Sequence, residues 1–159
     1  MTWEDELIRG CNDPATGKAV LSALKMLFQR DAKLMEADSS EPSITSCLGN
    51  YLKTEFPEWD VDCEYNRQGV IPKKLRINNI VKLVYPDIIV HRRQTDQNWL
   101  VIEVKKISNP ESDEVDLQKL QCFVEQLGYR HALFLRLDIQ RPQPSVSRLI
   151  WVHSNAASF

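Results

Sequence analysis

The segment YPDIIVHRRQTDQNWLVIEVK, residues 85–105, contains the pattern that decides the fold. Two apolar, β-branched runs are separated by a polar tip of the length of a hairpin loop. We therefore expect a β-hairpin whose two arms are buried strands. Charged residues interrupt both arms, with Asp87 in the first and Glu103 and Lys105 in the second. Because residues two apart in a strand share a face, Glu103 and Lys105 project together, and the hairpin can bring Asp87 beside them.

Charges inside such a hairpin need partners, because burying them alone is costly. The pattern therefore indicates either a divalent cation or tight ion pairing at this place. Two carboxylates and the backbone carbonyl of Val104 are hard oxygen ligands of the kind that suits Mg²⁺. A lysine two residues beyond a metal-binding glutamate can orient or deprotonate an attacking water molecule.

Helices and strands are expected on both sides of the hairpin. Pro42 fits the first turn of a helix, Gly128 fits the end of one, and the basic stretch 66–82 suggests a loop or an irregular hairpin. The elements expected from hydrophobic spacing are helices over 19–35 and 41–56, strands over 61–65, 83–90 and 99–105, a helix from 112 or 113 to 127, and strands over 132–135 and 149–152. This order predicts an α/β fold, with strand 61–65 beside strand 86–91.

The two charged arms also resemble a known motif. Pro86-Asp87, followed after fifteen residues by Glu103-Val104-Lys105, is similar to the bipartite motif of the PD-(D/E)XK nuclease superfamily. The resemblance implies a restriction-endonuclease-like α-β-β-β-α-β core with a mixed central sheet flanked by helices, plus an extra N-terminal helix. It further implies a single nuclease-like domain over 1–159, with a helical extension (1–38), a catalytic core (39–137) and a C-terminal loop and strand (138–159).

The same resemblance implies a metal-dependent hydrolase that cuts phosphodiester bonds. Asp87, Glu103 and Lys105 would be catalytic, and Asp87, Glu103 and the Val104 carbonyl would hold Mg²⁺ or Mn²⁺. The family often adds an acid from the preceding helix, which matches Glu41 here, with Glu64 and Asp62 as competitors. It also often carries a polar residue on the following helix, for which Gln118 and Lys119 are the candidates. For Glu41, an interaction with the helix dipole stays an alternative.

The charge distribution favours a nucleic-acid substrate more than the total does. The formal charge is −2, but residues 1–65 carry a net −7 and residues 66–106 a net +6. A basic stretch beside the motif can hold phosphates, although it can also be an ordinary solvated loop. The candidate nucleic-acid-binding residues are Arg67, Lys73, Lys74, Arg76, His91, Arg92, Arg93 and Lys106, and for His91 a plain surface position is the alternative.

Other features suggest the setting. No apolar run is long enough to cross a bilayer, the N-terminus is acidic, and four scattered cysteines suggest buried thiols in a reducing compartment. We expect a cytoplasmic protein with no membrane partner. The resemblance points to DNA as the substrate, because it is a resemblance to restriction, repair, recombination and phage-defence enzymes, and the sequence itself leaves DNA and RNA both open. The protein's specificity would come from a homodimer or from a larger defence or repair assembly, with helix 19–35 as a contact. The alternative function is a catalytically inactive nuclease-like domain that binds nucleic acid or protein.

Overall fold

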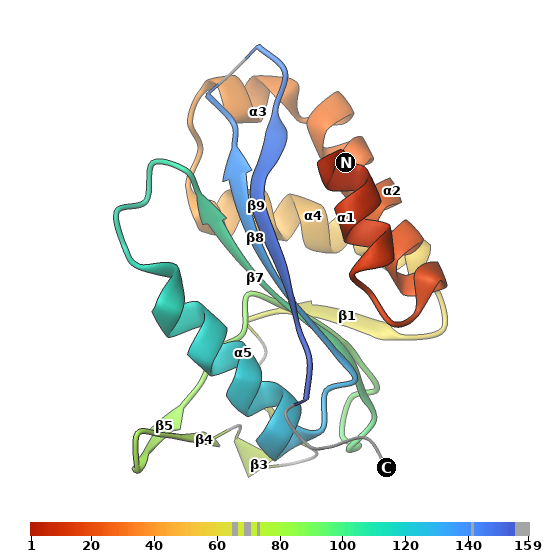
Figure 1. Ribbon diagram of the computed structural model, residues 1–159. Coiled ribbons are helices and arrows are strands. Elements are labelled where there is room, and N and C mark those ends of the chain that lie inside the picture. Colours follow the sequence, from red (N-terminus) through yellow and green to blue (C-terminus); the bar gives the residue numbers. More distant parts are fainter. Residues whose placement is uncertain (65–66, 69–70, 73, 141, 155–159) are drawn as a thin grey trace.

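A computed structural model of the chain describes residues 1–64, 67–68, 71–72, 74–140 and 142–154 (Figure 1). The helices are α1 (Trp3–Arg9), α2 (Pro14–Arg30), α3 (Ala32–Glu36), α4 (Glu41–Glu55) and α5 (Asp113–Leu127). The strands are β1 (Asp60–Cys63), β2 (Arg67–Gln68), β3 (Ile71–Pro72), β4 (Lys74–Ile77), β5 (Ile80–Leu83), β6 (Ile88–His91), β7 (Asn98–Lys106), β8 (His131–Asp138) and β9 (Ser145–Val152).

The centre of the fold is a mixed sheet with the strand order β1-β6-β7-β8-β9. Strands β7 and β8 run parallel, whereas the other neighbours are antiparallel. The structure thus confirms an α/β fold with helices on both sides of a mixed sheet (Figure 1). Strand β1 pairs with β6 as the sequence predicts, with Val61 opposite Val90.

The two faces of the sheet pack against different helices, and residue parity decides which face a side chain takes. Even-numbered residues of β6 and β7, such as Ile88 and Ile102, join the core formed with α1, α2 and α4. Odd-numbered residues, such as Ile89 and Val101, join a second core with Leu120 of α5. This alternation directs Glu103 and Lys105 towards α5.

The predicted elements agree with the structure in type more often than in length. The helix expected over 19–35 is instead α2 followed by the short α3, with a break at Asp31. Strand β6 begins at Ile88 rather than at 83, because residues up to Leu83 belong to the hairpin of β4 and β5. The basic stretch therefore contains two short hairpins, β2–β3 and β4–β5.

Helix α1 was not predicted, because its seven residues bury only Leu7 and show no apolar stripe. Its first turn is instead stabilised by a capping box between Thr2 and Asp5. Helix α5 ends as predicted, with Gly128 in the left-handed region at φ 67°. Of the four cysteines only Cys11 is buried, so the expectation of buried thiols is wrong for the exposed Cys63. In the described part of the chain, no helix has the length and apolarity needed to span a bilayer.

Candidate active site

A pocket of about 360 Å³ opens where β6 and β7 meet the first turns of α4 and α5. Both halves of the sequence motif reach it: Asp87 from the residue before β6, and Glu103, Val104 and Lys105 from near the C-terminal end of β7. The remaining lining residues are Glu41, Pro42, Thr45, Glu64, Asn109, Glu111, Asp116 and Lys119. The pocket thus brings six carboxylates together with two ammonium groups.

Asp87 is attached directly to the second half of the motif. Its Oδ2 accepts a hydrogen bond of 2.8 Å from the backbone N–H of Val104. Burial raises the pKa of the Asp87 carboxyl, and the Val104 hydrogen bond opposes that rise. The contact fixes the relative position of the two motif segments.

Glu103 is the most buried acid of the pocket, with 3% of its surface exposed. Burial raises its pKa well above the ordinary value, and the charge of Asp87 adds to the rise. Lys119 Nζ lies 2.8 Å from Glu103 Oε1, an ion-pair contact that lacks hydrogen-bond geometry. Lys119 Nζ also donates a 3.1 Å hydrogen bond to the Tyr85 carbonyl. A single ammonium group therefore compensates two crowded carboxylates.

Lys105 is turned towards the start of α5. Its Nζ lies 2.9 Å from Asp116 Oδ2 and 3.4 Å from Glu111 Oε2, and it donates a 3.1 Å hydrogen bond to the Ser112 carbonyl. Burial opposes the charge of Lys105, but Asp116 and Glu111 outweigh it and raise the lysine pKa. The ammonium form is therefore favoured, which suits a group that orients water or balances negative charge and disfavours a general base.

Both competing acids, Glu41 and Glu64, line the pocket. Glu41 accepts hydrogen bonds from Asn109 Nδ2. Glu64 follows the last residue of β1. Its positive φ of 53° breaks the strand alternation that would otherwise place its side chain on the same face as that of Asp62. Asp62 lies elsewhere, bound to His91 and Arg93, so the structure separates it from the other two acids.

The basic candidates fall into different places. Lys74 and Arg76 are exposed on β4, whereas Lys106 pairs with Asp38 at 3.1 Å. Beyond β6, Arg92 lies over the Trp59 ring at 4.7 Å from its centroid. Arg67 lies in β2 with its side chain outside the description, and Lys73 lies outside the described residues.

His91 and Arg93 form a cluster around Asp62. His91 is 2% exposed, and its Nε2 lies 2.7 Å from Asp62 Oδ2, so a surface histidine is the wrong interpretation. Arg93 Nε donates a 2.9 Å hydrogen bond to the same oxygen. The cluster joins β1 to the chain that follows β6, at the opposite end of β6 from Asp87. These contacts tie β1 to the end of β6 and the residues after it, while the Arg93 side chain stays 52% exposed.

Sequence reasoning missed Asp116, Glu111 and Asn109. A faint signal existed for Asp116, because it stands three residues before Lys119 on α5 and so shares its face. Asn109 and Glu111 belong to the connection between β7 and α5, where no periodicity indicates direction. Of the two residues considered on this helix, Lys119 reaches the pocket, while Gln118 bonds Asn78 at 2.9 Å.

The residues present fit a hard divalent cation. The donors are carboxylate oxygens and one backbone carbonyl, and the buried Glu103 oxygen faces a cation already. As the described side chains stand, no three of His, Cys, Asp or Glu are grouped to hold a metal ion. The Glu103 carboxylate is paired with Lys119, and the Glu41 carboxylate accepts hydrogen bonds from Asn109. Binding a cation at these two acids therefore requires both contacts to rearrange.

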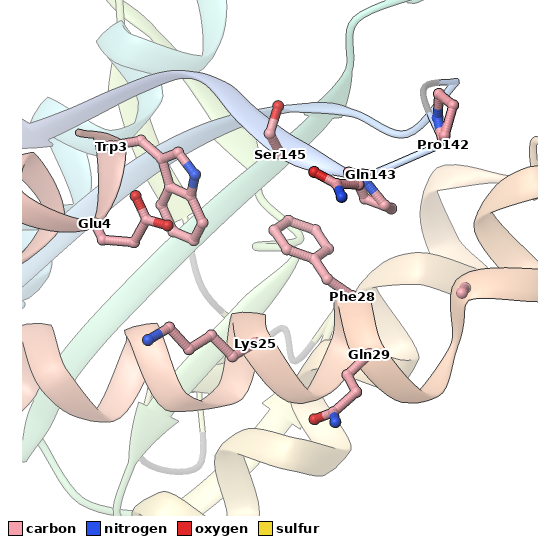
Figure 2. A pocket seen from close by; sticks show the side chains of 10 residues that line it. Trp3, Glu4, Lys25, Phe28, Gln29, Pro142, Gln143 and Ser145 are labelled. Atoms are coloured by element: carbon pink, nitrogen blue, oxygen red, sulfur yellow. The ribbon is translucent and has the colours of Figure 1, made fainter.

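A larger cavity of about 770 Å³ lies away from these acids, between α1, α2 and the segment 142–145 (Figure 2). Its wall includes the rings of Trp3 and Phe28, which meet edge to face with centroids 6.0 Å apart. Glu4 and Lys25 are its charged lining residues. Because it brings no group of acids together, the smaller pocket at Asp87 is the better candidate for chemistry.

Comparison with known proteins adds little to this geometry. No family model and no curated protein matches the sequence. A solved structure described as "Crystal structure of SSO0001" is similar over 84% of this chain and 63% of that chain. The TM-score is 0.42 and the sequence identity 12%, and the chain spans less than two thirds of that protein. We draw no conclusion about function from a likeness of this degree.

Proposed function

We propose that the protein is a metal-dependent nuclease with a restriction-endonuclease-like core, which hydrolyses phosphodiester bonds in DNA by PD-(D/E)XK chemistry. The observation that carries the proposal is the hydrogen bond from Val104 N–H to Asp87 Oδ2, because it joins the two motif halves inside one acidic pocket. Six carboxylates beside two lysines make that pocket a place for a cation rather than for a phosphate alone.

Asp87, Glu103 and the Val104 carbonyl would hold Mg²⁺ or Mn²⁺, with Glu41 or Glu64 as a further ligand. The bound cation supplies a water of lowered pKa and balances charge on the phosphoryl oxygens. Burial raises the pKa of Glu103 and Asp87, so their charged forms are the costly ones, and a cation held between them would stabilise those carboxylates.

Lys105 acts as a charged orienting group in this scheme. Asp116 and Glu111 hold its ammonium group beside the pocket and raise its pKa, so it stays protonated while negative charge develops on the phosphate. With a cation at Glu103, Lys119 would no longer be needed as its counter-charge, and its ammonium group would be available to a phosphate oxygen.

The experiment that tests the proposal is plasmid nicking with Mg²⁺, Mn²⁺ or EDTA, with Lys105→Met as the matched control. We expect nicking with either metal, none with EDTA, and a strong loss in the variant. DNA binding without metal-dependent nicking on any DNA or RNA form would refute the enzyme and leave an inactive nuclease-like binding module.

A further inference from the structure

A second groove, of about 460 Å³, adjoins the candidate active site. Lys119 lines both, so the groove continues from the place where Glu103 lies. It runs between α5, the end of β5 and the connection to β6. The charged groups among its described lining residues are Lys82 and Lys119, and none of these residues is acidic. The groove is thus cationic where the neighbouring pocket is acidic.

Exposed apolar side chains line this groove. Leu83 is 52% exposed, Tyr85 55% and Val115 68%. Exposed apolar groups gathered around one groove mark a binding surface more often than isolated ones do. Tyr85 stands two residues before Asp87, and its backbone carbonyl accepts the hydrogen bond of Lys119, which lines both the groove and the acidic pocket.

The wall of the groove is held in place by α5. Gln126 of α5 bonds both backbone groups of Arg76 in β4, at 2.8 Å each, and Gln118 bonds Asn78 at 2.9 Å. Asn78 and Asn79 form the hairpin turn, with φ of 50° and 64°. The β4–β5 hairpin is therefore fixed against the helix that also carries Lys119.

We propose that this groove binds the unpaired base of a nucleotide next to the scissile phosphate, with the base stacked on Tyr85. An aromatic ring, aliphatic neighbours and two lysines match a base and its phosphates, whereas a paired base is enclosed in its duplex and cannot enter. The inference rests on the proposed function and deepens it: the substrate is single-stranded or frayed at the cleavage point.

The test is fluorescence anisotropy in EDTA, so that no strand is cut. A short labelled single-stranded DNA is compared with its duplex, for the wild type, Tyr85→Ala and Tyr85→Phe. We expect the single strand to bind more tightly than the duplex. Loss of stacking in Tyr85→Ala weakens single-strand binding by about 5- to 150-fold, while Tyr85→Phe keeps it. Val115→Glu, which puts a carboxylate at the groove, weakens it as well, and thermal melting checks that all variants fold.

A set of strands with one abasic site each locates the contact. At the position that stacks on Tyr85, removing the base abolishes the difference between wild type and Tyr85→Ala. Unchanged single-strand binding in Tyr85→Ala, or equal binding of duplex and single strand, overturns the groove. If Mn²⁺-dependent cleavage occurs and is the same in the wild type and Tyr85→Ala, the proposed nuclease activity is supported and the base-binding groove is refuted. If single-strand binding depends on Tyr85 but no metal-dependent cleavage occurs, the base-binding groove is supported and the nuclease activity is refuted.

Discussion

Replacing Lys119 by methionine removes the ammonium group that faces the buried Glu103 and lies near the half-buried Asp87. The ion pair spans 2.8 Å, and the side chains are 19% exposed for Lys119 and 4% for Glu103. Lys105, the other lysine of the pocket, is engaged by Asp116 and Glu111. The substitution therefore leaves an uncompensated carboxylate that water barely reaches.

The cost of this substitution depends on pH. Breaking a buried pair by removing one partner costs about 3–5 kcal/mol; because water reaches part of Lys119, we expect roughly 2–4 kcal/mol at about pH 8. Glu103 already has a raised pKa, and losing Lys119 raises it further. A folded-state pKa above the unfolded value means that the folded protein binds the extra proton. The stability of the folded protein therefore falls as pH rises from the unfolded-state pKa of Glu103 to its folded-state pKa. At low pH, where Glu103 is protonated in both states, the stability lost in Lys119→Met becomes smaller.

Urea unfolding of wild type and Lys119→Met at about pH 5.5 and about pH 8, in EDTA, measures this dependence. Glu103→Gln in the Lys119→Met background is the matched control, and we expect it to remove the pH-dependent part of the loss. Added Mn²⁺ should stabilise Lys119→Met more than the wild type, because a cation then replaces the missing ammonium group. Equal stability losses at both pH values would refute the assignment of Lys119 as the counter-charge of Glu103.

Three further outcomes are expected. Lys105→Met should lower the cleavage rate by about 10²–10³-fold while calorimetry still detects Mn²⁺ binding; loss of both would make Lys105 structural. His91→Ala should cost about 2 kcal/mol in urea unfolding because it breaks the buried contact with Asp62, and should leave DNA binding unchanged; weakened DNA binding at retained stability would return His91 to the nucleic-acid surface. Gly128→Ala should cost about 1 kcal/mol, because φ is 67° while no atom lies within 4 Å of the added Cβ, and a neutral result would contradict a purely conformational cost.

The sequence alone predicts those residues of the site whose positions follow from the alternation of side chains along a strand. Glu103 and Lys105 share a face because they stand two apart, and the hairpin register places Ile88 opposite Ile102, which brings Asp87 near Val104. Helix α5 is equally predictable, since its apolar spacing indicates the helix and Gly128 marks its C-terminal end.

The rest depends on where elements stop and turn, which periodicity does not encode. Glu64 enters the pocket because β1 ends at Cys63 and the backbone takes a positive φ at Glu64 itself. His91 is withdrawn from the surface by Asp62, a partner across the β1–β6 pair. Asp116 becomes part of the site through the packing of α5 on the sheet, a tertiary contact that no local pattern announces.

Anomalous diffraction from crystals soaked in Mn²⁺ tests the central claim most directly. The claim predicts one Mn²⁺ peak bound by the Asp87 and Glu103 carboxylates, with Lys119 Nζ moved away from its 2.8 Å contact with Glu103. The same map shows whether Glu41 or Glu64 joins the ion. A pocket without Mn²⁺, in which Lys119 still contacts Glu103, would contradict the claim and leave the acids as a structural ion-pair network.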